Sequence, residues 1–202
     1  MYLPKRVILV NGLPGSGKST LAAGLAAELS IPALGKDVVK EALSGLVSDA
    51  VPAARLGAIA MDVLWSVAAA MDGHALLDSW WFRPRDLEFA VEGLARCGHP
   101  PVVEVWCDVP AAVARQRHAE RHRHPVYDDA RHLTDSWAAW AADPQPLGIG
   151  PVIRVDTMSR VGVGQLAAAV TKQLTAERLG SVSSVIPAGT DRTGRVVYST
   201  DM

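Results

Sequence analysis

Short apolar runs alternate with longer helix-like segments along most of this chain. The run RVILV, for example, is rich in β-branched residues, whereas residues 17–29 are rich in alanine and leucine. Strand-like runs occupy residues 6–10, 31–37, 74–80, 100–108 and 151–156. Helical segments separate them, at residues 17–29, 37–46, 52–72, 83–98, 109–124, 127–143 and 163–179. This alternation predicts an α/β fold whose five-stranded parallel sheet is covered by helices on both faces.

We expect one domain over residues 1–179, because 202 residues suffice for a sizeable core. The tail at residues 180–202 is rich in Ser, Thr and Gly, so it is either loosely attached or adds an edge strand through RVVYS. The most apolar helix is interrupted by Asp62 and Ser66, which favours a core helix over a membrane span. Because the N-terminal residues also lack the pattern of a secretory signal, we expect a cytoplasmic protein.

Charge and cysteine content narrow the classes of partner. Lys and Arg total 20 against 21 acidic residues, a net charge of −1, which argues against nucleic acid as the main partner. A local basic patch that binds nucleic acid remains an alternative. The two cysteines, Cys97 and Cys107, lack CxxC spacing, so we expect free buried thiols in a reducing compartment. The sequence leaves the oligomeric state open.

The segment NGLPGSGKST, residues 11–20, lies between the first predicted strand and the first predicted helix. It fits the G-x-x-x-x-G-K-[ST] pattern of a Walker A phosphate loop. Its glycines allow backbone N–H groups to curl around an anion, and the positive end of the helix dipole points at the same place. The motif therefore predicts a nucleoside triphosphate site made of Gly12, Leu13, Pro14, Gly15, Ser16, Gly17, Lys18, Ser19 and Thr20.

Three side chains complete the predicted phosphate site. We expect Lys18 to bridge the β- and γ-phosphates and to be exposed in the empty loop. The Ser19 hydroxyl would ligate Mg²⁺, and Asp78, at the end of a buried strand, would hold one of its waters. The alternative for Asp78 is that it only caps the following turn.

Three further segments, GKDVVKEAL, LLDSWWF and VVEVWCDVPAAVARQRHAERHRHP, carry a resemblance. Together with the phosphate loop, they resemble the small P-loop kinases grouped with chloramphenicol phosphotransferase and related AAA-type ATP-binding proteins. Zeta toxins and gluconate kinase are more distant relatives. The resemblance spans roughly residues 5–178. It implies a three-layer P-loop NTPase fold with a helical lid over residues 115–135, and ATP with Mg²⁺ as cofactors.

The resemblance also implies a base that faces the acceptor hydroxyl, and Asp37 stands at that position. A carboxylate near the γ-phosphate can orient an alcohol and accept its proton. Asp37 also begins a predicted helix, so it can serve as an N-cap, and the two roles are compatible.

The predicted lid begins in a basic helix that contains RQRHAERHRHP. Arg117 and Arg121 lie one turn apart on it and point the same way. In small kinases such arginines neutralise charge that develops on the transferred phosphoryl group, and Arg121 is the first choice for this role. A solvated basic face and a nucleic-acid patch are the alternatives.

Aromatic residues after Asp78 predict the acceptor site. Successive side chains at a strand end diverge, so at least one of Trp80, Trp81 and Phe82 should face the cleft. With Arg83 or Arg85 nearby, such a wall would suit a small organic molecule that carries hydroxyl or acidic groups. Ordinary packing is the alternative. Trp65, Trp137 and Trp140 read mostly as core, and residues 156–159 are expected to lie near the nucleotide base.

These observations leave three hypotheses. The first is an ATP-dependent kinase that phosphorylates a hydroxyl of a small molecule, such as an antibiotic, a sugar or another metabolite. The second is a nucleoside, nucleotide or polynucleotide 5′-kinase. The third, from another class, is a nucleotide-dependent regulatory module that hydrolyses ATP slowly. The sequence identifies neither the acceptor nor the preference for ATP over GTP.

Overall fold

The computed structural model describes residues 5–47, 50–121, 124–127 and 131–179. Five parallel strands form one sheet in the order β2-β3-β1-β4-β5. Their bounds are β1 (Val7–Asn11), β2 (Ala33–Gly35), β3 (Ala75–Asp78), β4 (Val102–Asp108) and β5 (Val152–Asp156). The predicted fold class is confirmed. The predicted C-terminal tail and parts of the predicted lid lie outside the described residues.

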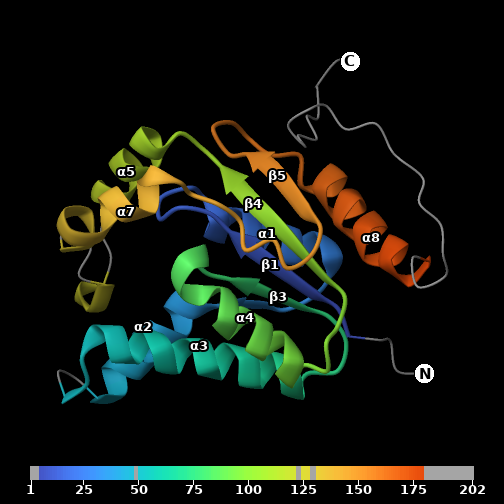
Figure 1. Ribbon diagram of the computed structural model, residues 1–202, viewed down its shortest axis with the longest axis horizontal. Helices are drawn as coiled ribbons and strands as arrows, with labels where there is room; N and C mark the ends of the chain where they lie inside the picture. Colours follow the sequence, from blue (N-terminus) through green and yellow to red (C-terminus); the bar gives the residue numbers. More distant parts are fainter. Residues whose placement is uncertain (1–4, 48–49, 122–123, 128–130, 180–202) are drawn as a thin grey trace.

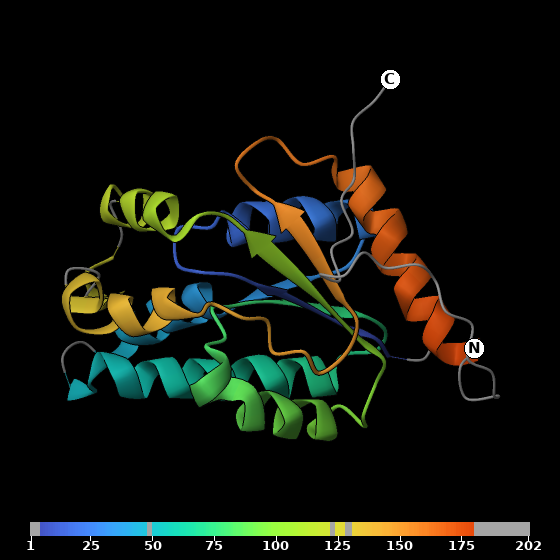
Figure 2. The same ribbon diagram turned by 45° about the horizontal axis from the view of Figure 1, so that its top comes forward.

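Helices cover both faces of the sheet, as Figures 1 and 2 show. One face carries α1 (Lys18–Leu29) and α8 (Val163–Leu179), and the other carries α3 (Ala53–Ala70) and α4 (Arg83–Arg96). The helices near the arrowheads of the strands in Figure 1 are α2 (Lys36–Val47), α5 (Ala111–Ala119) and α7 (Trp137–Ala142).

The segment between α5 and α7 differs from the prediction. The helix predicted over 109–124 ends at Ala119, within the basic segment RQRHAERHRHP, where a longer helix would place Arg117 and Arg121 one turn apart. The helix predicted over 127–143 is divided instead among a 3₁₀ turn at Pro125–Tyr127, a π-helical turn at His132–Ser136 and α7.

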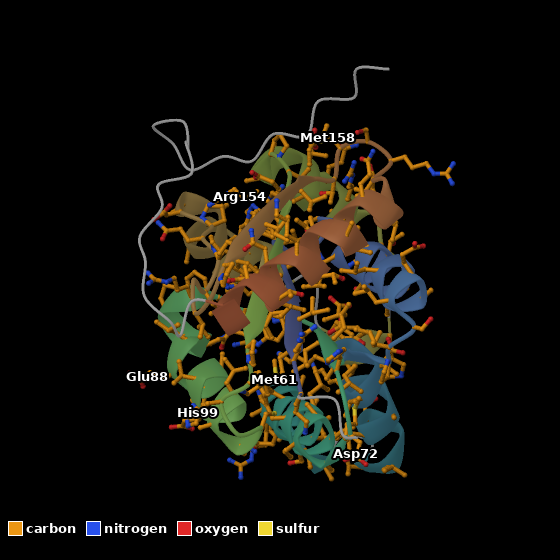
Figure 3. All side chains as sticks on the ribbon, turned by 90° about the vertical axis from the view of Figure 1, so that its right-hand side faces the viewer. Met61, Asp72, Glu88, His99, Arg154 and Met158 are labelled. Atoms are coloured by element: carbon orange, nitrogen blue, oxygen red, sulfur yellow. The ribbon has the colours of Figure 1, made fainter. Side chains whose placement is uncertain are left out.

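Alternate residues of the strands build two separate cores. On the central strand, Ile8 and Val10 pack toward α1 and α8, whereas Val7 and Leu9 pack toward α3 and α4. Figure 3 shows the molecule from the side, with Met158 in the loop after β5 far from Met61 on α3. The strands are therefore buried on both faces, as their continuous apolar runs predict.

Helix α3 needs separate mention because, among the described residues, it is the one helix long and apolar enough to cross a membrane by length and composition. Its Leu64, Trp65 and Ala68 pack in the core beneath the sheet. This packing accounts for its apolar composition in the way the sequence predicts for a core helix.

The register of the sheet brings the polar strand ends together. Asp78 at the end of β3 is the register partner of both Val10 in β1 and Gly35 in β2. The residues that follow β1 and β2 are the phosphate loop and the start of α2, so both emerge beside Asp78. This edge of the sheet is where ligands bind in open parallel sheets.

Candidate active site

The phosphate loop is folded tightly against α5. Gly15 and Gly17 both have φ of 87°, a conformation that disfavours side chains. At Gly15 an added Cβ would lie only 2.1 Å from the carbonyl oxygen of Ala114, so the backbone of α5 fills the space of a side chain. The loop conformation therefore depends on glycine at this position.

The N-terminus of α1 is left open for an anion. Gly17 is its N-cap and provides no side-chain hydrogen bond, and the first turn contains no acidic residue. The first N–H groups of a helix need partners, and the dipole makes a negatively charged partner favourable. This end of α1 thus fits a phosphate group.

Lys18 lies inside the loop rather than in solvent. Only 7% of the residue is exposed, so the expected exposure is wrong. The loop closes around the side chain, and the carboxylates of Asp78 and Asp37 attract it inward. Burial lowers the pKa of Lys18, while these two carboxylates counteract the shift.

Asp78 and Ser19 form the part of the site that fits Mg²⁺. Burial raises the pKa of Asp78, and Lys18 and the nearby Ser19 hydroxyl offset part of that rise. The Oδ1 atom of Asp78 is buried and accepts no hydrogen bond from the residues the structure describes. An acceptor in this state next to a hydroxyl suits a water bound to Mg²⁺.

Cys107 lies behind the loop and adds no nucleophile. An added Cβ on Gly12 would lie 2.8 Å from the Cys107 carbonyl oxygen, which places the two backbones in close contact. Burial raises the pKa of the Cys107 thiol to about 12, so it stays protonated. Cys97 is the other free thiol and is half-buried.

Asp37 lies in the first turn of α2 and interacts electrostatically with Lys18 and Asp78. Its backbone carbonyl is 2.8 Å from the Tyr127 hydroxyl, which is also 2.8 Å from Glu41 Oε1. These contacts join the 3₁₀ turn of the predicted lid to the start of α2. Asp37 is thereby held beside the phosphate loop.

The two predicted arginines lie in different surroundings. Arg121 is close enough to interact electrostatically with both Lys18 and Asp78. Arg117 instead donates a hydrogen bond of 3.2 Å from Nη1 to the carbonyl of Thr157, in the loop predicted to lie near the base. An added Cβ on Gly17 would be 3.9 Å from Thr157, so this loop borders the start of α1.

A cavity of about 450 Å³ opens from the phosphate loop between α2, α3, α4 and the segment before α7. Its walls include the indole rings of four tryptophans: Trp65, Trp80, Trp81 and Trp140. Lys18 and Asp37 line it at the phosphate end. Trp80 packs against Trp140 at a centroid distance of 6.2 Å, so these two rings form one aromatic surface.

Two of the three predicted acceptor residues line this cavity, and the third does not. Trp80 and Trp81 line it, although both are nearly fully buried. Arg83 donates from Nε to the carbonyl of Leu147 at 3.1 Å and borders a second hollow on the other side of α4. The arginines that line the cavity are Arg85 and Arg96.

A buried carboxylate that sequence reasoning missed supports this arrangement. Glu104, in β4, is 1% exposed and accepts hydrogen bonds from Asn11 Nδ2 at 2.8 Å and from the backbone N–H groups of Leu147 and Gly148 at 2.9 Å. Asn11 Oδ1 in turn accepts the Trp81 N–H at 3.0 Å. The available signal was a lone charge inside the apolar run VVEVW.

Comparisons with known proteins agree with this architecture. The profile of a family described as an AAA domain, AAA_33, matches residues 7–146. A comparison with curated protein sequences finds no match.

Solved structures of similar fold are numerous. A proposed kinase from Chloroflexus aurantiacus is 22% identical, with 85% of this chain and 99% of that chain covered and a TM-score of 0.68. A gluconokinase from Sinorhizobium meliloti is 18% identical, with 90% of this chain and 96% of that chain covered and a TM-score of 0.52. Shikimate kinase from Acinetobacter baumannii, solved with shikimate, is 14% identical, with 88% of this chain and 96% of that chain covered and a TM-score of 0.50. At these identities the likeness shows the fold, which is that of P-loop NTPases.

Proposed function

We propose that this chain, which belongs to the AAA domain family, is an ATP-dependent P-loop kinase that phosphorylates a hydroxyl of a small molecule. The observation that carries the proposal is the continuity between the phosphate loop and the aromatic cavity. Lys18 and Asp37 line the same space as Trp80 and Trp81. A module that only hydrolyses ATP needs no such acceptor-sized cavity beside its phosphate site.

Each residue has a role in this proposal. The backbone of the phosphate loop and Lys18 would hold the triphosphate, while Ser19 and Asp78 would hold Mg²⁺. Bound ATP supplies the phosphoryl group, and Mg²⁺ neutralises charge on its oxygens. Asp37 orients the acceptor hydroxyl and takes its proton, and Arg121 stabilises the negative charge that develops.

The site gives less support to the other hypotheses. A polynucleotide kinase needs a groove for a strand, whereas this cavity is lined by closely packed tryptophans and is of small-molecule size. Arg117, one of the arginines of the basic segment that a nucleic-acid patch would use, donates a hydrogen bond to the Thr157 carbonyl. The gluconokinase and the shikimate kinase of similar fold are both small-molecule kinases, which favours the same choice.

Two finer expectations stay predictions. The first is that Asp37 faces the acceptor hydroxyl as in chloramphenicol phosphotransferase-like enzymes. This prediction rests on the sequence resemblance and on the position of Asp37. The other is a cytoplasmic location.

The test is a screen of pooled hydroxyl-bearing metabolites for transfer of the terminal phosphate from labelled ATP. We expect a phosphorylated small molecule with the wild-type protein and none with the Lys18→Met variant. ATP hydrolysis at the same rate with and without every pool would instead favour the regulatory module. A labelled oligonucleotide as the sole product would favour the second hypothesis.

A further inference from the structure

Two arginines that line the cavity are paired with carboxylates that also line it. Arg85 donates to both carboxylate oxygens of Asp86, at 2.6 and 2.7 Å. Arg96 forms a salt bridge of 3.0 Å with Asp62 at the outer end. These pairs cancel in the local charge balance and leave little attraction for a ligand.

Lys36 does not follow this pattern. It is the first residue of α2 and lines the cavity next to Asp37. Among the described residues, its ammonium has neither a hydrogen bond nor a salt bridge. An added Cβ on Gly57 would lie 3.8 Å from Lys36 Nζ, so the side chain reaches α3.

Three features make a cation unfavourable at this place in the empty protein. Burial and the nearby guanidinium of Arg85 lower the pKa of Lys36, against the opposing effect of Asp86. The positive end of the α2 dipole also lies there. Because the pKa falls on folding, the charged ammonium costs stability at every pH below its ordinary value, so this residue does not serve the stability of the empty fold.

An anionic ligand would reverse the disadvantages that the paired charges leave. It would replace lost hydration, suit the positive end of the α2 dipole and accept hydrogen bonds from the ammonium. Because Lys36 carries one positive charge and the neighbouring Arg85 is already paired with Asp86, a single negative charge suits this part of the site better than a phosphate dianion. The tryptophan wall beside it suits an apolar or aromatic body.

We propose that Lys36 binds a carboxylate of the acceptor, and that the acceptor class is a hydroxy acid with an apolar or aromatic body. This inference rests on the proposed kinase function. The carboxylate lies on Lys36 while the hydroxyl faces Asp37, the adjacent residue in the same turn. Lys36 thus selects the acceptor, and Asp37 acts on it.

The test uses a panel of hydroxyl-bearing aryl and alicyclic carboxylates, such as 4-(hydroxymethyl)benzoate, each paired with its primary amide. Affinities are measured by calorimetry with a non-hydrolysable ATP analogue and Mg²⁺ present. We expect wild-type protein to prefer at least one acid over its amide by about tenfold or more, the gain typical of a charge-assisted hydrogen bond. Lys36→Met should abolish this preference, Lys36→Arg should retain most of it, and the exposed Lys172→Met should leave it unchanged.

Each other outcome counts against the inference. Equal affinity for acid and amide, no binding by any pair, or equal loss of both in Lys36→Met would overturn it. Tighter binding of the corresponding phosphate monoester would overturn the carboxylate assignment. A melting temperature of Lys36→Met below that of wild type would show that the ammonium stabilises the fold instead.

Failure of the kinase function gives a different result. If the acids bind through Lys36 but ATP is not converted to ADP and phosphorylated acid, the proposed function fails and the binding assignment stands. If neutral amides are phosphorylated as fast as the acids, the kinase stands and the acceptor class fails.

Discussion

The two ends of the candidate site are built in different ways. The phosphate end comes from one short segment, residues 11–20, whose backbone and glycines form the cradle. The acceptor end is assembled from side chains on α2, α3, the start of α4 and the segment before α7. Phosphate recognition here is local and mostly made by the backbone, whereas acceptor recognition depends on tertiary packing. Phosphate recognition can therefore stay constant while acceptor recognition varies.

The sharpest test of the junction between the two ends is Asp37→Asn. Asp37 lies inside the first turn of α2, one residue past its start, so it is not the N-cap expected from the sequence. Asparagine keeps the size of the side chain, but it cannot accept a proton. We expect kcat to fall about 10²- to 10⁴-fold, the usual contribution of a general base, with ATP affinity unchanged. Steady-state kinetics and calorimetry measure the two quantities. Asp72→Asn, at an exposed position after α3, is the matched control. Transfer at the wild-type rate would place the base elsewhere.

Lys18→Met tests the phosphate end alone. Methionine keeps much of the buried volume and removes the charge, so we expect kcat/KM for ATP to fall about 10²- to 10³-fold, as for loss of one stabilising group. Because burial lowers the pKa of Lys18, removing the charge should not reduce the melting temperature. Lys172→Met is the control. A variant with full activity would refute the role of the loop.

Asp78→Asn should affect the metal requirement. We expect the Mg²⁺ concentration for half-maximal rate to rise about 10- to 100-fold, as when a group that orients a metal ligand is lost. The raised pKa of Asp78 adds a pH test, since the carboxyl must be ionised to act. In wild type the Mg²⁺ requirement should increase as the pH falls toward that raised pKa, and in the variant this increase should vanish. Identical titrations for both proteins would exclude Asp78 from the metal site.

The smallest expected effect is on stability, from Glu104→Gln. An amide nitrogen cannot accept the N–H of Leu147 or Gly148, so a buried donor loses its partner. We expect a loss of about 1–3 kcal/mol and a melting temperature lower by about 2–4 °C per kcal/mol. Thermal denaturation measures it, with Glu88→Gln on α4 as a control. An unchanged melting temperature would show that the network is dispensable.

The extent of successful sequence prediction follows the same division. The strands, the phosphate loop and the proximity of Asp37 to Asp78 are accessible because apolar periodicity is local and parallel strand ends share one edge. The burial of Lys18 could not be predicted from the sequence, because it depends on how the loop closes around the side chain. The choice between Arg83 and Arg85 depends on how α4 lies against Leu147, a contact across 64 residues.

Glu104 illustrates why the remaining part of the site was missed. Its partners lie 93 residues earlier, at Asn11, and 43 residues later, at Leu147. No pattern within β4 encodes either distance, so the charge could be recognised as unusual but not as a support for the site.

The contact between Gly15 and the carbonyl of Ala114 also limits how the molecule can move. Backbone meets backbone there, so no side-chain rotation can loosen the contact. The amide of His118 is close to the same point, at 3.0 Å from the added Cβ. The first two turns of α5 are therefore expected to travel with the nucleotide loop as one rigid body. A hinge for the lid predicted over residues 115–135 would have to lie beyond His118.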